Sequence, residues 1–391
     1  MSNPRLCPSF AFRVTTVALF VAMIAIVPPV GADSVTPDAD AGPAAAAIDP
    51  DANVTPDPHV RVRGMTISCP GAGRVWGSDA MVETMAKLEA MGVNWVAIHP
   101  YAGISPDGTV GGSRLDRMYE DTTWITRPIA EAHRLGLKIM IKPHIAYWGS
   151  PFSWRGEITF STDEQWERFF TTYERWINRV AEISAGADAF VVGTELDRTV
   201  DREASWRRII AGVRSRIDTP LSYAANWDQF ETVPFWDALD VIGVQGYFPL
   251  VDHERVPTQA ELDASWQRLV GRLETFGKRF DRRVVLAELG YNRTAEAAVR
   301  PWEYRQGGEA AELVQRRCLT AALAALEDSD GVVGAFLWKW FPGERNRGNF
   351  LKSTPAMQRV IQRAWTPTAT GPRRTGMRSG PAPGSGTVSS P

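Results

Sequence analysis

Eight short apolar runs recur along the middle of the chain, and longer stretches of mixed polarity separate them. The runs lie at 59–68, 93–101, 137–145, 187–196, 220–227, 239–248, 283–291 and 332–341. Seven of them are rich in β-branched residues and bounded by Gly, Pro, Asn or Asp, whereas the first is more polar and alternates. This pattern predicts eight strands.

The stretches between the runs show helical periodicity. Within 162–184, apolar side chains recur every three or four positions from Trp166 to Val180, and Thr162 precedes two acidic residues as an N-cap would. Two further clear helices, each with the glycine expected to close it, are 79–91 with Gly92 and 258–276 with Gly277.

Eight strand-then-helix units predict a parallel sheet that closes into a (β/α)8 TIM barrel spanning 59–365. An open doubly wound sheet is the alternative fold. The segment "SCPGAGRVWG" offers glycines for the first turn of such a sheet, but the acidic residue expected roughly 20 positions further on is not at a strand end.

The two ends of the chain differ from its middle. Residues 1–32 combine Arg5 and Arg13 with an apolar run and a small-residue cleavage site, which indicates a secretory signal peptide and a secreted or periplasmic protein. An uncleaved membrane anchor is the alternative, although the run is shorter than the roughly 20 residues that a span prefers. Residues 33–58 and 366–391 are biased in composition and predict a disordered linker and a disordered tail.

Composition and charge narrow the function. A formal net charge of −2 gives no basic surface for nucleic acid. Cys69 and Cys318 have no metal-binding spacing, and we do not expect a disulfide between them. His99 and His144 end neighbouring strands but lack the His-x-His pattern of metal-dependent barrels, so no metal is expected. Lys142 is better explained as a hydrogen-bond donor than as a Schiff-base lysine.

Two predicted strands end in a glutamate. "VVGTELDR" places Glu195 at the end of strand four, and "VVLAELGY" places Glu288 at the end of strand seven. A barrel carries its active site at these strand ends, and a buried carboxylate is costly unless it is paired or protonated. Retaining glycoside hydrolysis needs such a pair, one carboxyl as acid and one as nucleophile. The other strand ends supply His99, Lys142, His144, Asn226, Trp227, Tyr247 and Trp338.

The segments "NWVAIHPYA", "IKPHI", "VGTEL", "YAANWD", "IGVQGYFPL" and "AELGY" with "RPWEY" occur in an order that resembles glycoside hydrolase family 113, the β-mannanase-type family of clan A. The resemblance implies that Glu195 is the acid/base and Glu288 the nucleophile. It also implies that Tyr247 bonds Glu288 and that Trp338 lies under the −1 sugar. The residues implied to line the subsites are His99, Lys142, His144, Asn226 and Trp227. No cofactor is implied, and β-mannan is the first expected substrate.

One position departs from the clan pattern. Most members have an asparagine just before the acid/base glutamate, where it binds the sugar 2-hydroxyl, but this chain has Thr194. Asn226 is a candidate for that contact, and the sugar remains open among mannan, glucan and xylan. Two other functions remain as alternatives, a non-catalytic carbohydrate-binding barrel and a transglycosylase that uses the same site.

Overall fold

The computed structural model describes residues 61–69, 73–111, 119–343 and 348–366. The predicted signal peptide or anchor, the predicted linker and all but the first residue of the predicted tail lie outside the described residues. Within the described ranges, no helix is both long enough and apolar enough to cross a membrane.

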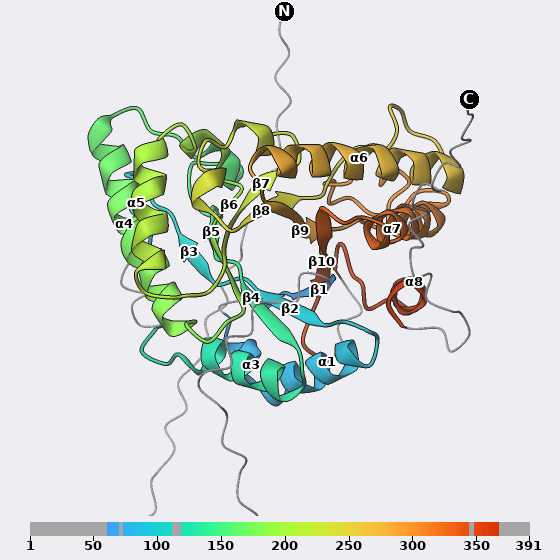
Figure 1. The fold of residues 1–391 in the computed structure, drawn as a ribbon, viewed down its shortest axis with the longest axis horizontal. Coiled ribbons are helices and arrows are strands. Elements are labelled where there is room, and N and C mark those ends of the chain that lie inside the picture. The colour runs from blue at the N-terminus through green and yellow to red at the C-terminus, as the bar shows by residue number, and fades with distance from the viewer. Residues whose placement is uncertain (1–60, 70–72, 112–118, 344–347, 367–391) are drawn as a thin grey trace, which may run out of the picture. The chain divides into compact units, whose positions relative to one another are not determined.

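Eight parallel strands close into a barrel, as the sequence predicts (Figure 1). They are β1 (Val62–Ile67), β2 (Trp95–Ile98), β4 (Lys138–Ile141), β6 (Ala189–Thr194), β7 (Leu221–Asn226), β8 (Val241–Gln245), β9 (Arg283–Leu289) and β10 (Val332–Trp340). The barrel closes because β1 pairs with β2 on one side and with β10 on the other. All carboxyl ends of the strands therefore meet at one mouth.

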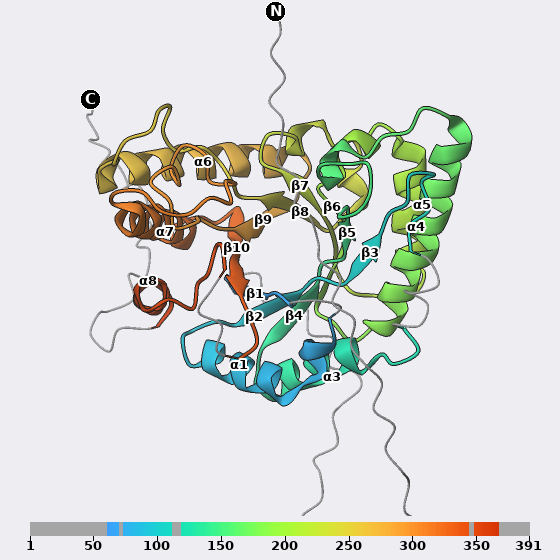
Figure 2. The same cartoon turned by 180° about the vertical axis from the view of Figure 1, so that it is seen from behind.

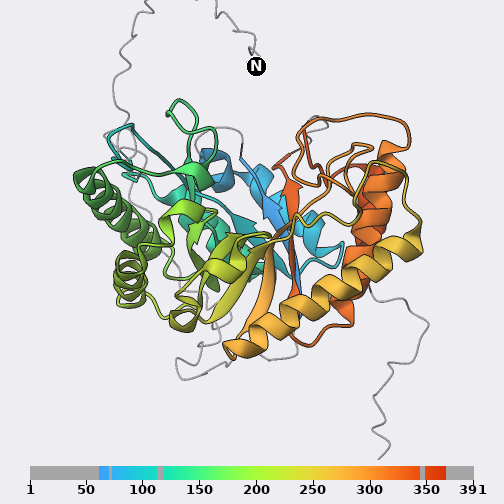
Figure 3. The ribbon, with the colours of Figure 1, turned by 90° about the horizontal axis from the view of Figure 1, so that it is seen from above.

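Helices surround the strands (Figures 2 and 3). They are α1 (Asp79–Glu89), α3 (Thr123–Arg134), α4 (Asp163–Ile183), α5 (Glu203–Arg214), α6 (Gln259–Arg279), α7 (Ala311–Glu327) and α8 (Pro355–Trp365). A large apolar core fills the space between the helices and the barrel, where Trp206, Trp266 and Ile361 are fully buried. A smaller cluster with Met140, Val191 and Phe336 comes from the alternate strand positions and fills the barrel interior.

The link from β7 to β8 differs from the prediction of eight helical units. Every residue of this link is described, and it holds only two 3-10 turns, η4 (Phe230–Thr232) and η5 (Trp236–Ala238). Pro234 lies between these turns and disfavours a continuous helix. The rings of Phe235 and Trp236 are fully buried and cover the barrel where a helix is expected.

Two predicted strands are each longer than the barrel strand that they contain, β2 and β4. The runs 93–101 and 137–145 are each interrupted by a proline, Pro100 and Pro143, which has no N–H for the ladder. Beyond the prolines the chain pairs again as β3 (Tyr101–Gly103) and β5 (His144–Ala146), a separate two-stranded parallel sheet above the mouth. This sheet forms one wall of the mouth.

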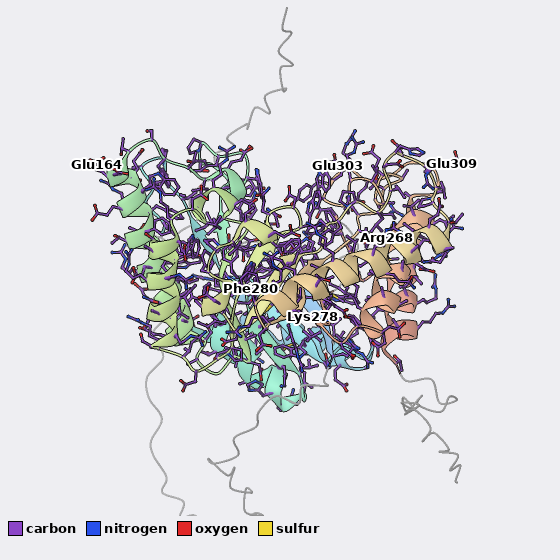
Figure 4. The ribbon with its side chains drawn as sticks, turned by 45° about the horizontal axis from the view of Figure 1, so that its top comes forward. Glu164, Arg268, Lys278, Phe280, Glu303 and Glu309 are labelled. Atoms are coloured by element: carbon purple, nitrogen blue, oxygen red, sulfur yellow. The ribbon has the colours of Figure 1, made fainter. Side chains whose placement is uncertain are left out.

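The helix ends follow the predictions with one correction. Thr162 caps α4 by accepting a hydrogen bond from the Gln165 backbone N–H. Gly277, however, does not close its helix, because α6 continues to Arg279, and Lys278 and Phe280 lie at its C-terminal end (Figure 4). A Cβ on Gly277 would lie 2.5 Å from the Arg282 carbonyl oxygen, so the glycine allows a close chain approach.

Candidate active site

Glu288 lies near the end of β9 and is almost completely buried, with 5% of its surface exposed. The Lys142 ammonium group contacts its Oε1 and also donates to the Ala287 carbonyl oxygen at 3.1 Å. The Tyr247 hydroxyl donates to Oε2 at 2.6 Å, so the hydrogen bond implied by the family resemblance is present. Both carboxylate oxygens therefore have a donor, which holds the carboxyl group in one orientation.

Glu195 follows the last residue of β6 and has a left-handed backbone, with φ at 52°. Its N–H donates to the Ala224 carbonyl oxygen of the neighbouring strand at 2.8 Å, which fixes the turn. Its Oε2 accepts a hydrogen bond from Arg155 Nη1 at 2.7 Å. A non-glycine residue with positive φ is uncommon, and such residues cluster at functional sites.

The surroundings of Glu195 favour its protonated form. Burial raises the pKa of Glu195; Arg155 opposes this effect, and the negative charge of Glu288 adds to it. The fully buried amide of Gln245 has no hydrogen bond of good geometry, but it lies near enough to lower the pKa of Glu195 slightly. A carboxyl group whose pKa is raised by burial has the environment of a general acid.

Trp338 of β10 and two buried imidazoles form the floor of the mouth. The rings of His99 and His144 stack with centroids 5.1 Å apart, and Trp338 lies 5.2 Å from His99. Burial holds the pKa of both histidines well below the ordinary value, so both are neutral. His99 Nε2 bonds the Ser68 hydroxyl at 2.9 Å, whereas His99 Nδ1 and both ring nitrogens of His144 lack a hydrogen-bond partner among the described residues. His144 Nε2 lies 3.8 Å from Glu288 Oε1.

Asn226 and Trp227 lie at the end of β7, beside Glu195. Asn226 Nδ2 donates to Asp197 Oδ2 at 2.8 Å. Burial raises the pKa of Asp197 to about 7. Trp227 stacks on Trp302, a residue of the loop after β9, with the ring planes 10° apart and the centroids at 5.5 Å. Because 42% of Trp302 is exposed, this pair offers a flat apolar face at the rim.

Thr194 does not take the place of the usual asparagine. Its hydroxyl donates to the Pro143 carbonyl oxygen at 3.1 Å, and the residue is buried. This contact ties β6 to the wall of the mouth. Thr194 therefore has a structural contact, and the amide of Asn226 bonds Asp197.

The structure brings all nine predicted residues to the barrel mouth, and it adds Arg155 and Gln245. Arg155 was missed because it comes from a loop forty positions before Glu195, where no spacing rule applies. The aromatic residues around it in "GSPFSWRGEITF" were the only signal. Gln245 ends β8, so the strand-end rule that found Glu195 applied to it equally.

The described residues contain no group of three or more His, Cys, Asp and Glu side chains placed to hold a metal ion. Cys318 is buried in α7 and forms no disulfide. A cavity of about 670 Å³ lies against the outer side of α4, near Arg175 and Arg179, and none of the candidate residues lines it.

A closed parallel barrel with carboxyl groups at the ends of its fourth and seventh strands, Glu288 buried and Glu195 partly buried, has the arrangement that the resemblance to the barrel glycoside hydrolases of clan A implies. The model of Glycoside Hydrolase Family 113 matches residues 65–349. The chain therefore belongs to glycoside hydrolase family 113. No curated protein matches the chain.

Solved structures agree with this membership. The chain is 26% identical to the family 113 β-mannanase AaManA from Alicyclobacillus acidocaldarius in complex with ManMIm, with a TM-score of 0.68 over 78% of this chain and 97% of that one. A family 113 β-1,4-mannanase in a complex is 23% identical, with a TM-score of 0.67 over 78% and 99%. A family 5 mannosidase from Rhizomucor miehei shares the fold at 10% identity and a TM-score of 0.51, over 78% and 92%.

Proposed function

We propose that the protein is a retaining β-mannanase in which Glu195 is the acid/base and Glu288 the nucleophile. The observation that carries this proposal is the asymmetry of the two carboxyl groups. Glu288 is held by Lys142 and Tyr247, while burial raises the pKa of Glu195. A carboxyl group with a raised pKa suits the acid, and a carboxyl group held by a cation and a hydroxyl donor suits the nucleophile.

The reaction follows from these roles. Glu195 gives its proton to the glycosidic oxygen, the bond from that oxygen to the anomeric carbon breaks, and Glu288 forms an ester with the same carbon. Glu195, now ionised, then takes a proton from water while the water oxygen attacks the anomeric carbon and the ester breaks. The net change is hydrolysis with retained configuration, and both carboxyl groups return to their starting forms.

β-Mannan is the substrate we propose. The first support is the likeness to AaManA, a β-mannanase that is 26% identical to this chain and is matched over 97% of its own length. The site also offers exposed aromatic surfaces, which support a substrate made of sugar rings in general. Trp148 is 64% exposed beside Tyr101 of the wall sheet, and Trp302 is exposed on the loop after β9.

The first test is hydrolysis of β-mannan, glucomannan, xylan and β-glucan by the full chain, with chromatography of the products. Glu195→Gln and Glu288→Gln should lose turnover by about 10²-fold or more while the unfolding temperature stays near that of the unaltered protein. Arg208→Gln, which removes an exposed ion pair with Glu174 on the helices, is the matched control and should keep full activity.

The alternatives give different results in the same experiment. Substantial activity in either glutamine variant would overturn the assigned roles. Products longer than the starting oligosaccharide would indicate transglycosylation. Binding without any product, together with no labelling of Glu288 by a 2-fluoro glycoside, would indicate a carbohydrate-binding barrel.

We also propose that the protein acts outside the cytoplasm, secreted or periplasmic. The support is the basic, apolar and small-residue pattern of residues 1–32. Cell fractionation and N-terminal sequencing of the mature protein test this proposal. An intact N-terminus in the membrane fraction would indicate the anchor instead.

A further inference from the structure

Arg155 is the one guanidinium group that contacts either catalytic carboxyl group in the part of the chain that the structure describes. Its Nη1 donates to Glu195 Oε2 at 2.7 Å, and its Nε donates to the Ile145 carbonyl oxygen of β5 at 3.2 Å. The side chain is 11% exposed and that of Glu195 is 15% exposed. This ion pair is therefore shielded from water, unlike most arginine pairs on the helices.

The backbone that carries Arg155 is tightly packed. Arg155 begins the 3-10 turn η2 (Arg155–Glu157), and the ring of Trp154 folds over Gly156, where an added Cβ would lie 2.1 Å from it. Ile158 directly after the turn is fully buried. The guanidinium also lies 5.8 Å from the centre of the Tyr147 ring. This packing fixes the backbone of Arg155, and from there the guanidinium group reaches Glu195.

Several other groups act on the same carboxyl. The other titratable groups whose charges interact with that of Glu195 come from several elements. They are Lys142 after β4, Tyr223 on β7, Tyr247 after β8, Glu288 on β9, Tyr304 on the following loop and Asp197 on η3 (Asp197–Thr199). Lys142 is the only other cation among them, and it contacts Glu288. Each catalytic carboxyl group thus has its own cation.

We propose that Arg155 is a positioning residue that stabilises the ionised form of Glu195 once its proton has left, and that it thereby sets the pH range of the reaction. This inference rests on the proposed function of Glu195. When Glu195 protonates the leaving oxygen, the negative charge that appears on its carboxylate lies 2.7 Å from a guanidinium nitrogen that is already in place. The same contact then orients the carboxylate toward the incoming water.

The sign of the effect follows from the charges. Arg155 lowers the pKa of Glu195 against the raising effect of burial. An opposite charge at this range shifts a carboxyl pKa by about 1–3 units. Without that charge, Glu195 stays protonated to higher pH. The acid step then persists to higher pH, and the base step, which needs the ionised form, also begins at higher pH.

The experiment compares Arg155→Gln with Arg155→Lys in the full chain. Gln keeps hydrogen-bonding capacity and loses the charge, whereas Lys keeps the charge. The pH dependence of kcat/KM on manno-oligosaccharides reports the acid. The pH dependence of kcat on a dinitrophenyl β-mannoside, whose leaving group needs no proton, reports the base step. Arg208→Gln is the matched control at an exposed pair of nearly equal length, 2.8 Å.

We expect the alkaline limb of kcat/KM to move up by about one pH unit or more in Arg155→Gln and to stay within about half a unit in Arg155→Lys. The acidic limb of kcat on the aryl mannoside should move up in the same variant. If the pH profiles of Arg155→Gln, Arg155→Lys and the unaltered protein coincide, or if both variants lose the same amount of activity, Arg155 only holds the loop and the inference is overturned.

The outcomes separate this inference from the proposed function. If the unaltered protein hydrolyses no mannoside, the proposed function is wrong, and the role of Arg155 in that reaction is wrong with it. If it is active and Glu195→Gln is not, unchanged limbs in the Arg155 variants count against the inference alone. If Arg155→Gln does not fold, Arg155→Met and Arg155→Lys provide the same comparison of charge.

Discussion

Lys142 is a fully buried cation whose ammonium group contacts Glu288 and lies 5.3 Å from the centre of the Trp338 ring. Burial lowers the pKa of Lys142, and the charge of Glu288 opposes this effect. The pair is therefore mutually dependent. Removing one partner of a buried pair leaves the other charge without compensation, which costs about 3–5 kcal/mol.

We predict that Lys142→Met loses activity by about 10²-fold or more and lowers the free energy of unfolding by about 3 kcal/mol. Steady-state kinetics on manno-oligosaccharide and urea unfolding measure the two effects. Lys138→Met is the matched control, because Lys138 begins the same strand β4 and lies 5.5 Å from the centre of the Trp95 ring, away from the mouth. Equal behaviour of the two variants would contradict the prediction.

At the scale of residues, the sequence predicted those site residues that lie on or next to strands. Glu195, Glu288 and Lys142 follow from one rule, because a strand end has one possible place in a barrel. The partner of Glu195 did not follow from that rule. Arg155 reaches the mouth through a loop whose path depends on how Trp154 packs over Gly156, and single-sequence periodicity does not encode such packing.

At the scale of elements, the ends of α1 and α8 meet through a glycine. Gly92 follows α1 with φ at 87°, and a Cβ there would lie 2.6 Å from the carbonyl oxygen of Trp365, the last residue of α8. Gly136 follows α3 with φ at 72°, but nothing lies within 4 Å of its would-be Cβ. The two positions share the backbone conformation and differ in packing.

We therefore predict that Gly136→Ala costs about 1 kcal/mol, from the left-handed backbone alone. Gly92→Ala should cost at least about 1 kcal/mol more, because the Trp365 backbone must move. Denaturant unfolding of both variants gives the difference. A smaller loss for Gly92→Ala than for Gly136→Ala would show that α8 moves away freely.

The same scale shows why the element predictions succeeded and where they failed. Buried parallel strands are nearly continuous apolar runs, and seven of the eight strands were found by that pattern, whereas the first was found by its alternation. The helix expected between β7 and β8 is absent from this fully described link because buried aromatic rings cover the sheet there, and periodicity does not distinguish such rings from a short helix. Gly277 was misinterpreted because a glycine needed for close packing resembles one needed for a helix end.

For the whole molecule, Lys352 couples stability to pH. It is fully buried between β10 and α8, donates to the Phe350 carbonyl oxygen at 2.9 Å, and has a pKa lowered by burial to about 7. In the unfolded chain the ordinary value is about 10.4. Between these two values the unfolded chain binds a proton that the folded protein does not, so stability rises with pH.

We predict that this group adds up to about 1.4 kcal/mol of unfolding free energy per pH unit between pH 7.5 and 9.5. Below about pH 7 the contribution levels off, because both states are then protonated. Urea unfolding at several pH values should show a steeper rise for the unaltered protein than for Lys352→Met. Parallel curves for the two proteins would rule out a neutral Lys352 in the folded state.

The wall sheet of β3 and β5 has a consequence for how such a protein changes over generations. The sheet continues the register of the barrel pair below it, because Ile98 is opposite Ile141 and Tyr101 is opposite His144. The Lys142 N–H donates to the Ile98 carbonyl oxygen and the His144 N–H to that of Pro100, so hydrogen bonds join the two parts past both prolines. An insertion in this wall would shift that register and displace His144 from the mouth, whereas exchanges of its exposed side chains would keep the scaffold and the carboxyl pair in place. Selection can therefore reshape the wall for a new polymer while the chemistry below it is conserved.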